Sequence, residues 1–398
     1  MGRTPADGSQ LIAILPEEYY TCRPVGYGSG MRNLVFILFL IAFLSLVAGV
    51  NIYLSRRFSY YFGMAHINRI YLVSGLLTVF MLGGIRVFTN SVDPLGHTIY
   101  MAASVLIGFA LYLIMSVILV DLIHLFVKAK PVLLGITAIA VAVIVFSYGI
   151  WHAYNPKITT TEIPIKGITQ EIRAMHISDI HLGHFRGKKY MRKIVEATRG
   201  LNIDIVFLTG DLFDGKIKPQ EEAISPLEQL EVPVYFVEGN HDGYAGPESI
   251  KQKLRKKGMF VLENEVARWG EWQIIGLDYM EAYSPSHDSR ALREGAAIRD
   301  ILPTLGIDPA KPSILLHHSP IGIEYVSQYG IDLYLAGHTH GGQLFPVTFL
   351  ARFMYPYYRG LYEYRGTRIY VSQGAGTFGP PLRVGTRNEL AVIILKPA

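Results

Sequence analysis

Cysteine is nearly absent from this 398-residue chain, which contains only Cys22. A single cysteine excludes both an internal disulfide framework and a zinc site built from thiolates. Blocks of lysine and arginine interleaved with aromatic residues are also lacking, so the net charge of +5 does not indicate nucleic-acid binding. Any metal site in this chain therefore has to use nitrogen and oxygen ligands.

Charged residues are scarce as well, at 17% of the chain against 50% apolar residues. The apolar excess lies before residue 152, in runs of about 20 residues, the length that a helix needs to cross a bilayer. These runs cover residues 34–54, 70–88, 99–120 and 132–151. We expect an integral, multi-pass membrane protein with a disordered tail, 1–30, and four transmembrane helices within 31–152.

Basic residues in the short loops predict the orientation of these helices. The first loop contains Arg56, Arg57 and Arg69, and the third contains Lys128 and Lys130. The positive-inside rule places both loops in the cytoplasm. With four spans, the region that follows them is then expected to be extracytoplasmic.

The composition changes to that of an α/β domain after a polar segment, 153–171, which we expect to be a linker. Within 172–398, short β-branched runs alternate with amphipathic helical patterns. The predicted strands are 173–177, 203–208, 232–237, 273–277, 313–316, 333–336, 369–372 and 391–395. The predicted helices are 188–199, 220–230, 248–257 and 289–301.

Side chains that bind metals stand at the ends of several predicted strands. Asp179 and His181 are two residues apart just after strand 173–177, so both can turn toward one ion. Four later segments offer similar groups: Gly210-Asp211, Gly239-Asn240-His241-Asp242, His317-His318-Ser319-Pro320 and Gly337-His338-Thr339-His340. Ligands at the carboxyl ends of strands are the expected site geometry in layered α/β folds.

Two carboxylates, one amide and four imidazoles are the candidate ligands. They are Asp179, His181, Asp211, Asn240, His318, His338 and His340. This mixture suits a pair of divalent ions, with Mn, Fe, Zn and Co all compatible. Two divalent ions would outweigh the two carboxylate charges, and the surplus positive charge favours an anionic substrate.

In their order, the motifs D-x-H, G-D, G-N-H-D, H-x-P and G-H-T-H resemble those of the calcineurin-like metallophosphoesterases, over residues 172–398. The longer segments 337–343 and 371–383 resemble the membrane-associated YkuE-type phosphodiesterase branch of that family. The resemblance implies a β-sandwich flanked by helices. The expected fold class is therefore α/β, with a four-helix transmembrane region followed by this sandwich.

The resemblance also implies how the ligands divide between two metal ions. Asp179, His181 and His340 would hold the first ion, Asn240, His318 and His338 the second, and Asp211 would bridge them. His241 would protonate the leaving oxygen or stabilise charge on it, while the two ions activate a water. Arg383, in a glycine-rich segment, is a candidate for binding the phosphate of the substrate.

Some residues near these motifs leave alternatives open. Asp242 either orients His241 or caps its loop, and Asp214 is expected in a turn rather than as a ligand. The H-x-P pattern selects His318 over His317. Residues 345–364, rich in Phe and Tyr, either pack against the domain or form an amphiphilic rim that meets a bilayer or an acyl chain.

Together, these features predict a membrane-anchored, dinuclear metal-dependent phosphoesterase. The expected reaction is hydrolysis of a phosphodiester or pyrophosphate, with lipid-linked or nucleotide-linked envelope precursors as candidate substrates. Two alternatives remain: a phosphomonoesterase, and a non-catalytic membrane sensor or scaffold that uses the same fold.

Overall fold

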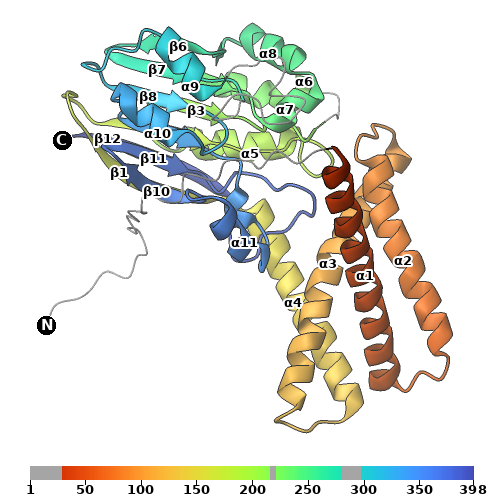
Figure 1. The fold of residues 1–398 in the computed structure, drawn as a ribbon. Coiled ribbons are helices and arrows are strands. Elements are labelled where there is room, and N and C mark those ends of the chain that lie inside the picture. Colours follow the sequence, from red (N-terminus) through yellow and green to blue (C-terminus); the bar gives the residue numbers. More distant parts are fainter. Residues whose placement is uncertain (1–28, 216–220, 280–296) are drawn as a thin grey trace, which may run out of the picture. The chain divides into compact units, whose positions relative to one another are not determined.

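The structure is a computed structural model that describes residues 29–215, 221–279 and 297–398. These residues form two compact units (Figure 1). The sheet unit consists of Trp151–Phe378 and Arg383–Ala398, and the helical unit consists of residues 29–150 with Gly379–Leu382. Nearly all of the predicted tail, 1–30, lies outside the described residues.

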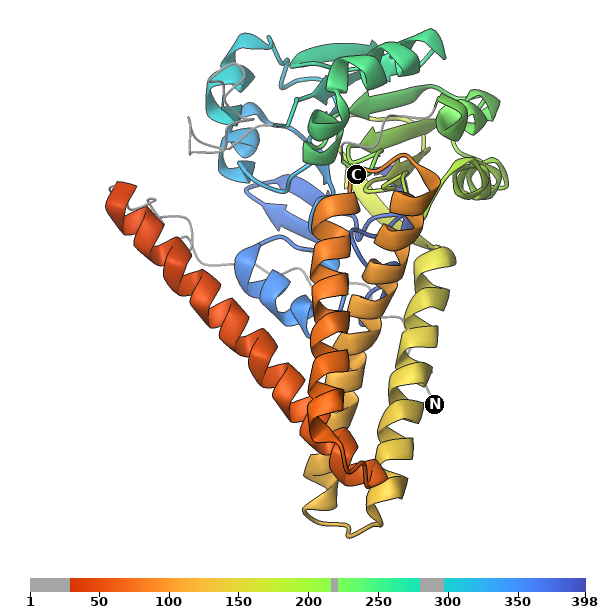
Figure 2. The same ribbon diagram turned by 90° about the vertical axis from the view of Figure 1, so that its right-hand side faces the viewer.

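Four helices stand where the sequence predicts membrane spans: α1 (Ser29–Phe62), α2 (Ile67–Phe88), α3 (Pro94–His124) and α4 (Pro131–Tyr154). Each is long and apolar enough to cross a bilayer. The Asp93 side chain caps α3 by accepting a hydrogen bond from the Gly96 amide. Figure 2 shows the N-terminal half of α1 diverging from the other helices, and residues 33–46 are all exposed.

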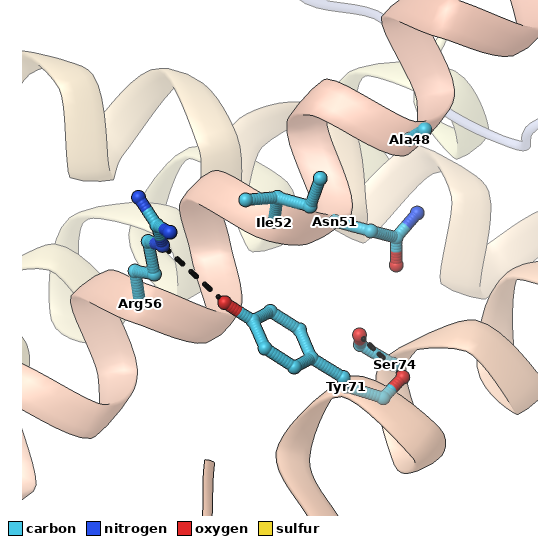
Figure 3. Close-up of a pocket in the computed structure, with 6 residues that line it drawn as sticks. All are labelled: Ala48, Asn51, Ile52, Arg56, Tyr71 and Ser74. Carbon is cyan, nitrogen blue, oxygen red and sulfur yellow. Dashed lines mark hydrogen bonds between the residues drawn. The ribbon is translucent and has the colours of Figure 1, made fainter. Parts of the chain in front are cut away.

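Polar side chains connect α1 to its neighbours within the helical unit. Asp121 of α3 pairs with Arg57 and accepts hydrogen bonds of 2.5 Å from Tyr53 and Tyr61. A pocket of about 430 Å³ lies between α1 and α2 (Figure 3). It is lined by Ala48, Asn51, Ile52, Arg56, Tyr71 and Ser74, and Arg56 Nε donates to Tyr71 Oη at 3.3 Å.

Two six-stranded sheets form the sheet unit. The first has the order β1-β12-β2-β3-β4-β5 and the second β10-β11-β9-β8-β7-β6. The first sheet comprises β1 (Lys157–Ile165), β2 (Ile172–Ile177), β3 (Ile205–Thr209), β4 (Val234–Val237), β5 (Phe260–Val261) and β12 (Glu389–Pro397). The second comprises β6 (Glu265–Trp269), β7 (Trp272–Gly276), β8 (Ser313–Leu316), β9 (Leu333–Ala336), β10 (Gly360–Tyr364) and β11 (Thr367–Val371).

Each sheet contains a series of neighbouring parallel strands, β2 to β5 in the first and β7, β8, β9 and β11 in the second. One buried cluster contains side chains of both sheets, among them Phe207, Val237, Ile274, Leu316 and Leu335. The sheets therefore face each other across a shared apolar core, as the predicted sandwich requires.

Helices cover the outer face of each sheet. On the first, α5 (Lys188–Arg199) and α8 (Pro247–Lys256) bury residues such as Met191 and Leu254 in an apolar cluster. On the second, α9 (Ile298–Ile301) and α10 (Ile323–Val326) do the same with Ile298 and Val326. The predicted β-sandwich flanked by helices is confirmed. Three further helices are α6 (Glu221–Ile224), α7 (Asn240–Ala245) and α11 (Val347–Met354).

The predicted linker, 153–171, is wrong in part, because nine of its residues form a strand. Residues 157–165 form β1, which pairs in parallel with β12, and Ile163 and Ile165 are buried. Threonine and isoleucine favour strands, but the polar composition of the segment obscured this preference. The pairing partner also lies more than 220 residues away in the sequence.

Two predicted helices differ from the observed ones. The predicted helix 220–230 is divided into α6 and a 3₁₀ helix at Ser225–Gln229 that has Pro226 in its first turn. Of the predicted helix 289–301, residues 289–296 lie outside the described residues, and α9 covers Ile298–Ile301.

Candidate metal site

The predicted ligands follow strands of both sheets. The first sheet supplies four of them: Asp179 and His181 after β2, Asp211 after β3 and Asn240 after β4. The second sheet supplies three: His318 after β8, and His338 and His340 after β9. Because neighbouring parallel strands end at the same edge of a sheet, each set is gathered by its own sheet.

The side chains of six site residues form three overlapping groups that could hold a metal ion. The groups are Asp179, His181 and His340; Asp179, Asp211 and His318; and His181, Asp211 and His241. Within each group, one ligand atom per residue lies within 4.8 Å of the others. Shared members connect the groups, so both sheets contribute to one continuous site.

Asn240 and His338 complete the set. Asn240 Oδ1 lies 3.0 Å from His338 Nδ1, and the His338 amide donates to both carboxylate oxygens of Asp179 at 3.1 Å. The rings of His318 and His338 have their centroids 5.1 Å apart. All seven predicted ligands and His241 are therefore brought together, although 161 sequence positions separate the first from the last (340 − 179).

The backbone of the site is unusual. Asp179, His181, Asp211, His338 and His340 have positive φ angles between 51° and 71°. Residues with a Cβ rarely adopt this left-handed conformation, and such strain is concentrated at functional sites. Packing around these residues must therefore hold a conformation that the isolated backbone disfavours.

Glycines beside the ligands allow the loops of the two sheets to approach each other. A Cβ on Gly337, in the second sheet, would overlap Ser178 Oγ and the Asp179 carboxylate of the first. A Cβ on Gly239 would overlap the Asp211 carboxylate. Any larger residue at these positions would push the ligands apart.

The surroundings of His318 show that the site fits a cation. Its Nδ1 donates to the Thr209 carbonyl at 2.7 Å, which directs Nε2 toward Asp211 Oδ2, 3.2 Å away. Among the described residues, this buried Nε2 has no partner with hydrogen-bond geometry. Burial lowers the pKa of His318, but Asp211 and Asp179 outweigh burial and raise it to about 10. A divalent ion could replace the proton that balances these carboxylates.

The arrangement of His181 and His340 also fits a divalent cation. Their Nε2 atoms lie 3.1 Å apart, and His340 Nε2 is 3.3 Å from Asp179 Oδ1. Imidazole nitrogens and a carboxylate oxygen at this spacing suit a shared divalent cation. Burial also lowers the pKa of His338 to about 3, so that this ring is neutral and can act as a ligand. The residues thus fit a pair of divalent ions.

Comparison with known proteins agrees with this geometry. Residues 172–342 match the calcineurin-like phosphoesterase family. A metallophosphoesterase from Aquifex aeolicus is 34% identical over 246 residues, which cover 60% of this chain and 89% of that protein. The chain belongs to the calcineurin-like metallophosphoesterase family.

Two further members of the family are similar. A transmembrane protein with a metallophosphoesterase domain from Danio rerio is 34% identical over 281 residues, 66% of this chain and 63% of that protein. The metallophosphoesterase YkuE from Bacillus subtilis is 27% identical over 270 residues, 63% of this chain and 90% of that protein. The present chain thus spans less than two thirds of the Danio rerio protein.

Arg383 lies in the interior of the sheet unit rather than on its surface. Its side chain is 0% exposed, and this burial does not support the predicted contact with a substrate phosphate. Its guanidinium donates to the His340 carbonyl at 2.7 Å and to Asn388 Oδ1 at 2.9 Å, and it also lies 3.0 Å from His340 Nδ1. Arg383 therefore positions a predicted ligand instead.

The chain of contacts beyond Arg383 reaches the end of α4. Asn388 Nδ2 donates to the Ala153 carbonyl at 2.5 Å and to Tyr190 Oη at 2.8 Å. Arg186 also donates to the Ala153 carbonyl, at 3.1 Å. These contacts satisfy a carbonyl in the last turn of α4, where helical partners are lacking.

Asp242 and His317 both contact backbone groups of neighbouring loops. Asp242 is buried and accepts hydrogen bonds from the Leu212, Phe213 and Gly239 amides, so it caps its loop rather than orienting His241. His317 belongs to none of the candidate metal groups of the described residues, and its Nδ1 lies 2.8 Å from the Ser319 carbonyl and 3.0 Å from Tyr334 Oη.

Asp214 has a larger part in the site than its predicted place in a turn suggests. Its Oδ1 lies 3.7 Å from the Nδ1 atoms of both His181 and His241. The spacing of three residues from Asp211 was the available signal in the sequence. Phe378, whose ring centroid lies 5.0 Å from that of His241, had no such signal.

Proposed function

We propose that this protein hydrolyses phosphoesters at a pair of divalent metal ions, with a phosphodiester or pyrophosphate as the reacting group. The observation that carries the proposal is the convergence of seven ligand side chains from two sheets on one buried site. Family membership supports the same chemistry.

The proposed ligands keep the division that the family resemblance implies. Asp179, His181 and His340 would hold one ion, Asn240, His318 and His338 would hold the other, and Asp211 would bind both. When bound, two divalent ions supply Lewis-acid chemistry that activates water and stabilises charge on the phosphoryl group. Mn, Fe, Zn and Co each suit these ligands.

His241 is the proposed proton donor to the leaving oxygen. Its amide donates to Asp211 Oδ1 at 2.8 Å, which fixes the residue beside the proposed bridging ligand. Burial lowers the pKa of His241 to about 4, and Asp214 lies on its Nδ1 side. The Asp214 carboxylate opposes this effect of burial by favouring the imidazolium form, which is the form in which Nε2 would pass a proton to the leaving group.

The membrane location is part of the proposal. Four helices long and apolar enough to span a bilayer precede the sheet unit, and a similar Danio rerio protein is named as a transmembrane protein. We place the site outside the cytoplasm, because basic residues gather in the first and third loops. A reporter fused after Ala398 tests this orientation, and reporter activity in the cytoplasm would contradict it.

Hydrolysis of bis-p-nitrophenyl phosphate with added manganese tests the reaction in the full chain. We expect the Asp211→Asn and His241→Ala variants to lose at least about 100-fold in kcat/KM. The monoester p-nitrophenyl phosphate serves as a second substrate, and faster turnover of the monoester would indicate a phosphomonoesterase. A manganese-loaded wild type that hydrolyses neither compound would support the sensor or scaffold alternative.

A further inference from the structure

One side of α11, a helix of the sheet unit, is apolar although it is exposed. The exposed apolar face of α11 consists of Val347, Phe349, Leu350, Phe353 and Met354. Phe353 is 84% exposed and Met354 is 70% exposed. Such a contiguous exposed patch marks an interaction surface rather than the surface of a monomeric soluble domain.

The opposite side of the helix is fixed to the protein. Ala351 is buried, and Gly342 lets Ala351 and Thr348 approach so closely that any Cβ at that glycine would overlap them. Because residues three and seven positions apart share one side of a helix, Tyr355 continues this inner side after Thr348 and Ala351. The exposed apolar face therefore has a defined orientation.

This face continues to the candidate metal site. Gln343, which precedes α11, exchanges two hydrogen bonds of 2.8 Å with the backbone of Phe378. Phe378 is 53% exposed, and its ring centroid lies 5.0 Å from that of His241 and 6.1 Å from that of His181. On the other side, Tyr355 Oη lies 3.3 Å from His338 Nε2. Exposed apolar side chains and the predicted ligands thus border each other.

The chemistry of the face suits a lipid bilayer. Large apolar and aromatic residues with a basic residue at the border are typical of helices that lie in a membrane interface. Arg352 is exposed at the flank of the apolar face, where its long side chain can reach phosphate headgroups. The last candidate membrane span is also close in the sequence to the sheet unit, because α4 ends at Tyr154 and β1 begins at Lys157.

We infer that the exposed apolar face of α11, together with Phe378, inserts into the bilayer surface and presents the metal site to phosphoesters in amphiphile headgroups. The inference rests on the proposed function for the reaction itself. It adds the substrate class, which is an amphiphile whose phosphoester lies at the lipid–water interface. For residues 345–364, the inference favours the amphiphilic rim over packing against the domain in the part that forms α11. Tyr357 and Tyr362 of the same segment are buried.

The first experiment measures membrane contact without using catalysis. The chain has a single cysteine, so a Cys22→Ser background allows one nitroxide label at Phe353→Cys and, as the matched control, at Phe260→Cys. Phe260 is also exposed, but it lies in β5, at the edge strand of the first sheet. The labelled full chain is reconstituted into vesicles of phosphatidylcholine and phosphatidylglycerol, and collisions with oxygen and with a water-soluble nickel complex are compared.

We expect the label at position 353 to collide with oxygen and to be shielded from nickel, and the label at position 260 to show the reverse. Nickel access at 353 equal to that at 260 would overturn the inference. Shielding of 353 from both reagents would also overturn it, because a protein segment would then cover the face.

The second experiment links the face to substrate class. In the Leu350→Ser/Phe353→Ser variant, hydrolysis of a fluorescent phospholipid diester in vesicles should fall at least about tenfold, the loss expected when apolar side chains no longer enter the bilayer. Hydrolysis of bis-p-nitrophenyl phosphate should stay unchanged, as should both rates in Phe260→Ser. Equal losses on both substrates would contradict the inference. A wild type inactive on both substrates would refute the proposed function, while the nitroxide result would still decide membrane contact.

Discussion

The two sheets of the sandwich contribute different chemistry to the same site. The first sheet supplies every oxygen ligand, from Asp179, Asp211 and Asn240, together with one imidazole, His181. The second sheet supplies imidazoles alone. Carboxylates on one sheet thus meet neutral or protonated rings from the other, and the pKa of His318 is raised by Asp211 across this junction. Neither sheet holds a complete set of ligands, so metal binding should depend on how the sheets pack together.

The largest effect should come from removing one ligand of the first ion on either sheet. Asp179→Asn and His340→Ala should each lower the affinity for one ion by at least about 100-fold, because both residues would hold the same cation. The double variant should lose little more than either single variant, since the second change acts on a site already lost. Calorimetric titration with manganese measures this, and additive losses would show that the two residues do not share an ion.

Replacing His318 should separate metal binding from packing in the second sheet. His318→Ala removes a predicted ligand, whereas the adjacent His317→Ala removes a buried ring that contacts the Ser319 carbonyl and Tyr334 Oη. We expect His318→Ala to abolish binding of one ion and His317→Ala to lower only the melting temperature, by a few degrees. Metal loss in both variants would contradict this division.

A smaller effect is expected from Arg383, which belongs to neither sheet but holds His340. Arg383→Lys keeps the charge but cannot donate at once to the His340 carbonyl and to Asn388 Oδ1 while also contacting His340 Nδ1. Affinity for the first ion should fall about tenfold, as is usual when a ligand loses its supporting hydrogen bond. An unchanged affinity together with a raised KM would restore the substrate-binding role that the sequence suggested.

The smallest effect concerns a group of carboxylates that surrounds one lysine where β4 and β7 end. Lys251 lies there among Glu238, Glu263 and Asp278, at 3.1, 2.6 and 3.4 Å. Burial raises the pKa of Asp278 from 3.8 to about 7, with the charge on Glu238 adding to the effect. The folded state therefore holds an extra proton between about pH 4 and pH 7, and stability decreases as the pH rises through that window.

Asp278→Asn should flatten this part of the pH–stability curve. The melting temperature of the full chain in detergent, measured from pH 4 to pH 8, checks the prediction, with the exposed Asp300→Asn as the matched control. An identical slope in wild type and Asp278→Asn would show that this carboxylate does not titrate in the window.

The sequence was sufficient to predict the features that depend only on neighbouring residues. Asp179 and His181 directly follow an apolar run, and their place after β2 needed only that run and the residues beside it. The predicted strands 313–316 and 333–336 coincide with β8 and β9 for the same reason. The positions of the ligands at the carboxyl ends of strands were therefore within reach of sequence reasoning.

Features that depend on distant partners were missed. Strand β1 forms because β12 lies beside it, and its own polar residues gave no sign of that neighbour. Arg383 looked like a free charge near a glycine-rich turn, but carbonyls of His340 and Gly376 enclose it. Asp214 gains its place between two histidines only when the loops after β2, β3 and β4 converge.

The most direct test of the central claim is a crystal structure of the manganese-loaded protein with anomalous scattering recorded at the manganese edge. We predict two peaks per chain, one among Asp179, His181 and His340 and one among Asn240, His318 and His338, with Asp211 contacting both. A single peak bound by ligands of one sheet alone, or no peak at the junction of the two sheets, would contradict the claim that both sheets together build the metal site.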